Sequence, residues 1–129
     1  CHLRAVQQVF DENGNNVLDF PVVKEARLSP EATFQTVQLL KGVFTEGTAR
    51  LAQGSGVPTE VFAGKTGTTN DFKDAWFVGF NSEMLALTWV GYDETENVGL
   101  TGAAAALPLW IEFMKEAQPF RQNKDFARP

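Results

Sequence analysis

The residues best suited to chemistry lie together in segment 64–70, which reads GKTGTTN. On an extended chain, residues two apart share one face, so the hydroxyls of Thr66 and Thr68 would lie side by side. Lys65 would alternate to the same side as Gly67, whose missing side chain leaves room for a ligand. The pattern favours an edge that binds an anion such as a carboxylate, with the ammonium favouring deprotonated neighbours or polarising a relay of hydroxyls.

A phosphate-binding loop is one alternative for this segment. That loop requires a glycine five positions before Gly64 and a helix directly after the Lys-Thr pair. Position 59 is Thr59, and an aromatic strand is predicted to follow, so the helix N-terminus that would hold phosphate is missing. The other alternative is a polar turn between strands, and the local sequence does not separate it from a ligand edge because short motifs often match by chance.

Three predicted strands would position this segment, over residues 61–68, 75–80 and 85–92. The last two are separated by the short turn NSEM, and links of this kind imply antiparallel neighbours. One helix is predicted before the three strands in the sequence, and another after them. The first begins at Ser29-Pro30, where a serine N-cap precedes a proline at the first helical position. The second places its apolar residues on one side, as expected of a helix that lies on a sheet.

These elements divide the chain into a peripheral hairpin at 1–27, a helix at 28–52, three antiparallel strands at 60–93, a C-terminal helix at 102–118 and a tail at 119–129. The hairpin is supported by Asn13-Gly14, a pair that tolerates positive φ in a tight turn. The tail is mostly polar, and we expect it to be loosely held. Trp76, Trp89 and Trp110 are predicted to be ordinary core residues.

Length and composition narrow the class of protein. A chain of 129 residues with 43% hydrophobic residues supports one domain, or one piece of a domain. The net charge is -5 and the basic residues are scattered, which argues against nucleic acid as a partner. The longest uncharged apolar stretch is too short to cross a bilayer. Cys1 and His2 make a poor metal site, and we expect neither a metal nor another cofactor.

A family resemblance covers most of the chain. The segments that carry it are KTGTTND at 65–71, DAWFVGF at 74–80, WVGYD at 89–93, LSP at 28–30, LKGV at 40–43 and GTA at 47–49. From about residue 14 to about residue 115 the chain closely resembles, in register, the C-terminal part of the transpeptidase domain of class A penicillin-binding proteins. These are the bifunctional peptidoglycan synthases.

The resemblance implies an α+β fold, that of the penicillin-recognising serine transpeptidases and β-lactamases. In that fold a five-stranded antiparallel sheet is flanked by helices, and this chain would supply the last three strands and the C-terminal helix. The last strand, 85–92, would pair with the first strand of the domain, which this chain does not contain. We therefore expect that edge to be covered by the rest of the same protein or by a swapped copy.

The resemblance also implies that part of the catalytic machinery lies elsewhere. The family uses the motifs Ser-x-x-Lys, Ser-x-Asn and Lys-Thr-Gly, and only the third is present. None of Ser29, Ser55 and Ser82 has a lysine three positions later or an asparagine two positions later. The other motifs, a glycosyltransferase domain and the membrane anchor would precede residue 1, so this chain alone is expected to be inactive.

The resemblance assigns roles to five residues of the Lys-Thr-Gly strand. Lys65 would support the proton network of the active site and the substrate carboxylate. Thr66 and Thr68 would bind that carboxylate through their hydroxyls, and the Thr68 N–H would form half of the oxyanion hole. Gly67 would let the substrate backbone lie against the strand, and Thr69 would be a further substrate-binding residue.

The implied activity is that of a serine-type D,D-transpeptidase, an acyltransferase. A serine would attack the D-Ala-D-Ala amide of a peptidoglycan stem peptide, and β-lactams would acylate the same serine. The expected partners are stem peptides, β-lactams and the remaining part of the protein, at the outer face of the bacterial cytoplasmic membrane. Two alternatives stay open: a non-catalytic module that binds peptidoglycan or a partner through its sheet edge, and a β-lactamase relative, against which the continuation DAWF argues.

Overall fold

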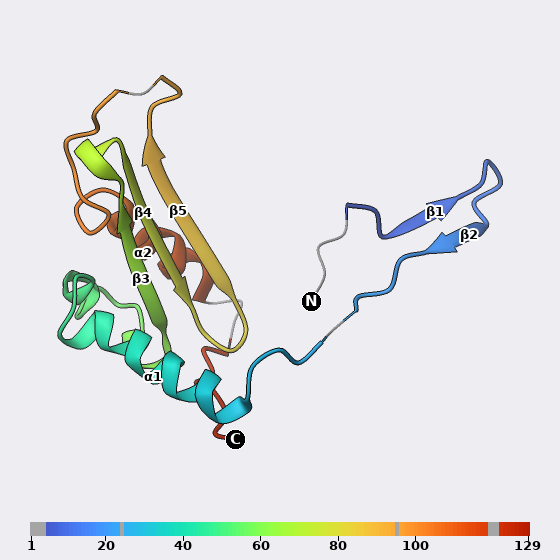
Figure 1. Ribbon diagram of the computed structural model, residues 1–129, viewed down its shortest axis with the longest axis horizontal. Coiled ribbons are helices and arrows are strands. Elements are labelled where there is room, and N and C mark those ends of the chain that lie inside the picture. Colours follow the sequence, from blue (N-terminus) through green and yellow to red (C-terminus); the bar gives the residue numbers. More distant parts are fainter. Residues whose placement is uncertain (1–4, 24, 95, 119–121) are drawn as a thin grey trace.

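Most of the described chain divides into two regions, a hairpin near the N-terminus and the group formed by the other helices and strands (Figure 1). The computed structural model describes residues 5–23, 25–94, 96–118 and 122–129. Strands β1 (Gln8–Phe10) and β2 (Asn16–Asp19) form an antiparallel hairpin that stands away from the other elements. Every residue of the two strands is exposed. Residues 5–23 are called the hairpin arm below, and the described residues from Ser29 onward are called the body.

Local hydrogen bonds close the turn of the hairpin arm. Asp11 Oδ1 accepts hydrogen bonds from the backbone N–H groups of Asn13 and Asn15, at 2.9 and 2.8 Å. The hydrogen bond from the Asn15 side chain is the largest cause that lowers the pKa of Asp11 below its ordinary value. Gly14 has a φ of 81°, a left-handed conformation that costs glycine little. The turn thus depends on contacts between residues that are close in sequence.

An antiparallel sheet forms the centre of the body. Its strands are β3 (Ala63–Thr68), β4 (Asp74–Phe80) and β5 (Leu85–Gly91), in the order β3-β4-β5. The predicted fold class is confirmed: the structure is α+β, and the last three strands form one antiparallel sheet. Asn81 Oδ1 accepts hydrogen bonds from the N–H groups of Glu83 and Met84, which closes the turn between β4 and β5.

Helix α1 (Pro30–Thr45) precedes the sheet. The Ser29 hydroxyl accepts a hydrogen bond from Ala32 N–H at 3.1 Å, and Pro30 occupies the first turn, so the helix begins where the sequence predicts. The segment 28–52, predicted to be helical, contains α1, which ends at Thr45, and the 3-10 turn η1 (Arg50–Ala52). A second 3-10 turn, η2 (Thr59–Val61), follows. The chain reverses at Gly47, where a Cβ would lie 2.7 Å from Val43 Cα.

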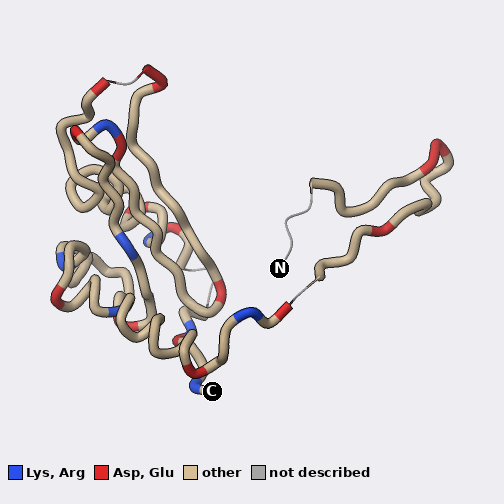
Figure 2. Tube along the Cα trace, viewed as in Figure 1, with Lys and Arg blue, Asp and Glu red and all other residues tan. Residues whose placement is uncertain are grey.

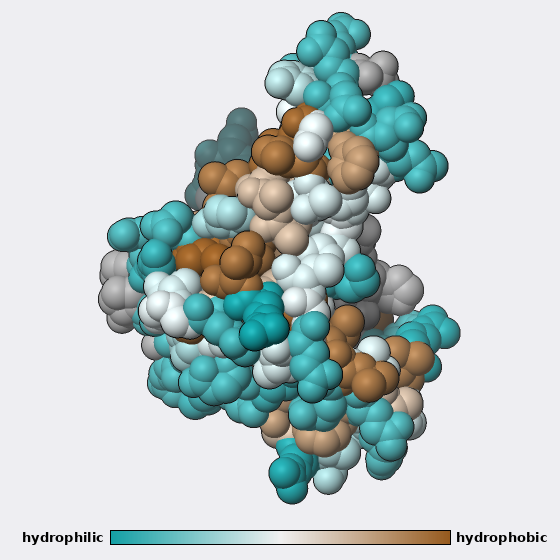
Figure 3. Space-filling view, turned by 90° about the vertical axis from the view of Figure 1, so that its left-hand side faces the viewer, coloured by the Kyte–Doolittle hydropathy of each residue, from teal (hydrophilic) through white to brown (hydrophobic). Residues whose placement is uncertain are grey.

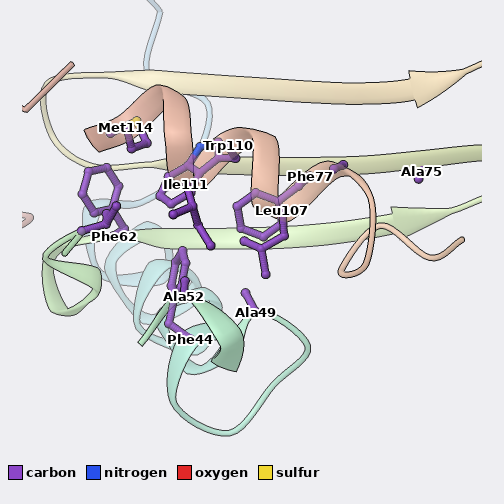
Figure 4. Close-up of a cluster of buried hydrophobic side chains, with 12 residues drawn as sticks. Phe44, Ala49, Ala52, Phe62, Ala75, Phe77, Leu107, Trp110, Ile111 and Met114 are labelled. Atoms are coloured by element: carbon purple, nitrogen blue, oxygen red, sulfur yellow. The ribbon is translucent and has the colours of Figure 1, made fainter. Parts of the chain in front are cut away.

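One hydrophobic core joins both helices to the same face of the sheet (Figure 4). Helix α2 (Ala106–Ala117) supplies Trp110, which is fully buried. The Trp110 ring centroid lies 5.2 Å from that of Phe77 on β4 and 5.7 Å from that of Phe44 on α1. A Cβ at Gly79 would lie 2.4 Å from the indole, so glycine is required there for the helix to approach the sheet. The helices therefore form one layer behind the sheet.

The opposite face of the sheet is largely left open by the described residues. Trp76 and Trp89 lie on it, 36% and 42% exposed, with ring centroids 5.9 Å apart. The prediction that all three tryptophans are core residues is therefore right for Trp110 and wrong for these two. Strand alternation explains the difference, because it turns Ala75 and Phe77 toward the helices and Trp76 away from them.

The described part of the tail, residues 122–129, contacts α1 and β4. Lys41 Nζ donates to both carboxylate oxygens of Asp125 at 2.8 Å, and the rings of Phe126 and Phe80 have centroids 5.6 Å apart. The expectation of a loosely held tail is thus wrong for these residues. The ion pair joins positions 84 apart in sequence, a distance over which local patterns carry no information.

The surface of the described residues is mixed in charge and hydropathy. Basic residues are dispersed among acidic ones along the trace and do not gather in one patch (Figure 2). The side of the molecule that lies at the left of Figure 1 shows hydrophilic and hydrophobic residues next to each other (Figure 3). Neither helix of the described chain is both long and apolar enough to cross a lipid bilayer.

Candidate functional site

Strand β3 forms one edge of the sheet, and its backbone faces two ways. The N–H of Thr69 donates to Asp74 O at 3.1 Å, which extends the β3–β4 register by one pair. In an antiparallel ladder every second pair exchanges hydrogen bonds, so Gly67 also directs its backbone groups at β4. Thr66 and Thr68 consequently direct their N–H and C=O groups outward, along the free edge. This edge presents backbone donors and acceptors to a ligand.

The side chains of β3 alternate between the two faces of the sheet. Thr66 pairs with the buried Phe77, so the side chains of Thr66 and Thr68 lie on the face that the helices cover. Lys65 and Gly67 lie on the open face. Along its free edge, β3 therefore has threonine hydroxyls on one face of the sheet, a lysine on the other face and backbone groups between them.

Both threonine hydroxyls are held from behind by other parts of the body. The hydroxyl oxygens of Thr66 and Thr48 are 2.8 Å apart, and Thr48 follows the C-terminal end of α1. The Thr68 hydroxyl accepts a hydrogen bond from Gly102 N–H at 3.1 Å, in the segment that leads into α2. The segment after α1 and the segment before α2 thus each contact one hydroxyl of β3.

Gly102 fits against the sheet because it has no side chain. A Cβ at this position would lie 2.4 Å from Trp76 O and 2.6 Å from Gly67 O. Real Cβ atoms do not approach backbone oxygens that closely, so any larger residue would push the segment away from β3. The close approach is what brings Gly102 N–H within hydrogen-bond distance of Thr68.

Lys65 brings a positive charge to the free edge. Its ammonium donates to the carbonyl oxygen of Thr66 at 2.6 Å, and the side chain is exposed. Because that carbonyl faces outward, the ammonium lies at the same edge as the Thr68 N–H. A lysine, a hydroxyl and a backbone N–H gathered at one strand edge are suited to an anionic ligand, since charge-assisted hydrogen bonds are the strong ones.

Thr69 makes structural contacts at the end of β3. Its hydroxyl accepts a hydrogen bond from Asp74 N–H at 2.8 Å and donates to Asp74 Oδ2 at 3.1 Å. The other oxygen of this carboxylate accepts from Trp89 Nε1 at 2.9 Å, so Asp74 joins the β3–β4 turn to β5. Asp71 and Phe72, inside that turn, both have positive φ. The structure thus groups four of the five predicted site residues at the edge and places Thr69 in the turn beside them.

Sequence reasoning missed Thr48 and Gly102. They lie 18 and 34 residues from their partners on β3, and each is an ordinary residue next to a helix end. Thr48 lies in GTA at 47–49, one of the segments that carry the family resemblance, but no role was assigned to it there. A second signal was the small-residue pair at each place, Gly47-Thr48 and Thr101-Gly102, which is typical of a close turn. Among the described residues no group of three or more His, Cys, Asp or Glu side chains is placed to hold a metal ion.

Most of the chain is similar to known proteins of one family. The family model described as the penicillin binding protein transpeptidase domain matches residues 3–114. Penicillin-binding protein 1A of Aquifex aeolicus (strain VF5) is 42% identical over 100% of this chain and 18% of its own length. Penicillin-binding protein 1A of Neisseria gonorrhoeae is 32% identical over 97% of this chain and 16% of its own length.

A solved structure supports the fold. The crystal structure of penicillin-binding protein 1A from Haemophilus influenzae superposes with a TM-score of 0.69, covering 96% of this chain and 24% of that chain, at 22% sequence identity. At that identity the likeness concerns the fold alone. The chain spans less than a fifth of the length of the Aquifex relative, 18%.

Proposed function

This chain belongs to the penicillin-binding protein transpeptidase domain family, and we propose that it supplies the Lys-Thr-Gly strand of a D,D-transpeptidase active site. The observation that carries this proposal is the free edge of β3, where the Lys65 ammonium lies beside the outward-facing backbone of Thr66 and Thr68. The substrate would be a peptidoglycan stem peptide that ends in a carboxylate, and β-lactams would bind at the same place.

In this proposal the residues at the edge of β3 have different roles in acyl transfer. The Lys65 ammonium and the threonine hydroxyls bind the substrate carboxylate and so fix the position of the peptide. The outward N–H of Thr68 stabilises the negative charge that develops on the carbonyl oxygen when the nucleophile attacks. Gly67 presents no side chain on the open face, so the substrate can approach the strand closely.

The attacking serine comes from outside this chain. The serine forms an ester with the stem peptide as the terminal D-alanine leaves, and an amine of a neighbouring stem then takes the acyl group and releases the serine. Since none of the serines of this chain stands in a Ser-x-x-Lys motif, the chain alone is expected to be inactive. The complete enzyme would act at the outer face of the bacterial cytoplasmic membrane, where its substrate is located.

Covalent labelling tests this function directly. The full-length protein that contains this chain is incubated with a fluorescent penicillin, and intact-mass spectrometry follows the adduct. We expect a long-lived adduct on a serine outside residues 1–129, and no adduct on the isolated chain. Rapid loss of the adduct with consumption of free penicillin would favour a β-lactamase, and no adduct on the full-length protein would favour a binding module.

A matched pair of lysine variants connects the labelling to β3. Lys65→Met removes the ammonium from the strand edge and should slow acylation at least about 100-fold, because it removes charge stabilisation at the reacting centre. Lys115→Met removes a lysine of α2 that contacts Glu112, and it should leave the acylation rate unchanged. Equal rates for the two variants would contradict the proposed role of Lys65.

A further inference from the structure

The Thr66 hydroxyl has a neighbour that neither sequence nor family resemblance assigns to the site. The hydroxyl oxygen of Thr48 lies 2.8 Å from that of Thr66, so the two share one hydrogen bond. Thr48 itself is exposed, whereas Thr66 is half-buried. The contact joins the end of α1 to the middle of β3, two elements that the core also holds together.

The backbone around Thr48 is fixed by its own contacts. Gly47 N–H donates to Gly42 O and Ala49 N–H donates to Val43 O, both at 3.0 Å, so the turn after α1 is tied to the helix on each side of Thr48. The Ala49 side chain is completely buried in the core. These contacts fix the backbone position from which the Thr48 side chain reaches Thr66.

The effect of this contact on a ligand depends on which of the two hydroxyls donates its proton to the other. A threonine hydroxyl has one proton to donate and two lone pairs to accept with. If Thr48 donates to Thr66, the Thr66 oxygen is satisfied as an acceptor, and its own proton remains available for an anionic ligand. We propose that Thr48 is a positioning residue of this site, which orients the Thr66 hydroxyl as a donor toward the substrate carboxylate. This inference rests on the proposed function.

The neighbouring threonine has the same arrangement by a different route. The Thr68 hydroxyl accepts from Gly102 N–H at 3.1 Å, which likewise occupies a lone pair and leaves the proton free. Two hydroxyls on one strand are thus each placed against a donor group that approaches from the helix side. Preorganised donors of this kind bind a developing or fixed negative charge without reorganisation at the moment of binding.

The test uses variants of the full-length protein and two forms of one β-lactam. Thr48→Val keeps the shape of the side chain and removes its hydroxyl. We expect the second-order rate constant for acylation by the free-acid lactam to fall about tenfold, because the Thr66 hydroxyl would no longer be oriented to donate to the charged carboxylate. The rate constant for the methyl ester of the same lactam, which has no carboxylate, should change less than about twofold, since the oriented hydroxyl acts on that group. Thr48→Ser should restore the free-acid rate.

Two further variants separate an effect on the ligand from an effect on the fold. Thr45→Val removes a hydroxyl from the same end of α1 that bonds to Gly42 O, and it should leave both rates unchanged. A fall of equal size for acid and ester would show that Thr48 only supports the fold and would overturn the inference, as would an unchanged acid rate. If the unaltered protein is acylated and Thr66→Val loses the acid preference while Thr48→Val keeps it, the inference alone fails. An unaltered protein without acylation would instead refute the proposed function.

Discussion

The hairpin arm and the body are organised by different interactions. The arm consists of exposed residues, and its turn is set by Asp11, which accepts hydrogen bonds from residues two and four positions away. The body holds the buried side chains around Trp110, and its site depends on bonds between residues 18 and 34 positions apart. A two-stranded hairpin alone is marginally stable in water, whereas a sheet packed on helices has a core. Changes in the body should therefore spread to the site, and changes in the arm should stay local.

The largest expected difference between the regions comes from removing a large side chain in each. Trp110→Ala should lower the free energy of unfolding by about 3–5 kcal/mol, because it leaves a cavity among fully buried aromatic rings. Phe10→Ala, on the exposed strand β1, should change it by less than about 0.5 kcal/mol. Urea unfolding followed by circular dichroism measures both, and similar losses would show that the arm is part of the same cooperative unit.

Two glycine variants should also affect the two regions differently, by a smaller amount. Gly102→Ala places a Cβ against the backbone oxygens of Trp76 and Gly67 and should cost about 1–3 kcal/mol through overpacking. It should also slow acylation of the full-length protein, since Gly102 N–H would move away from Thr68. Gly14→Ala meets no neighbouring atom, and its strain comes only from a positive φ in the arm.

Tryptophan fluorescence measures the unfolding of the body, because all three tryptophans of the chain belong to it. Gly102→Ala should lower the midpoint of the tryptophan transition in urea, and Gly14→Ala should leave it unchanged. A shift with Gly14→Ala would mean that the arm and the body unfold together, against the division described above.

Lowering the pH should change the stability of the folded state only slightly, through a separate carboxyl in each region. Hydrogen bonds from Asn15 lower the pKa of Asp11, and the Lys41 ammonium lowers that of Asp125. A carboxyl whose pKa is lower in the folded state stabilises that state at neutral pH, and the stabilisation is lost as pH falls from about the ordinary 3.8 through the lowered value.

Nuclear magnetic resonance at decreasing pH separates the two carboxyls. The amide signals of Asn13 and Asn15 should shift as Asp11 is protonated, and the signal of Phe126 should shift with Asp125, whose carboxylate accepts from its N–H. Asp11→Asn should abolish the first set of shifts at every pH and leave the second intact. Loss of both sets with this variant would contradict the independence of the two regions.

Local patterns predicted a substantial part of the fold. The start of α1 followed from Ser29-Pro30, and the antiparallel order of β4 and β5 followed from the short turn between them. The close packing of Gly47 against Val43, between α1 and η1, was not visible in these patterns, because it is a contact of the folded chain. The exposure of Trp76 and of Trp89 was missed because alternation gives two faces and does not say which face the helices cover.

The family, the strand that carries the Lys-Thr-Gly segment and the alternation of its side chains could all be predicted from the sequence, since they depend on residue types and on spacings of a few positions. Three features depended on the folded chain: the outward direction of the Thr66 and Thr68 backbone, the contacts of Thr48 and Gly102 with these threonines, and the return of the tail to Lys41. The two groups of features differ in the range of the interactions that produce them. Strand geometry acts between neighbours in sequence, whereas these contacts arise when the core brings distant segments together.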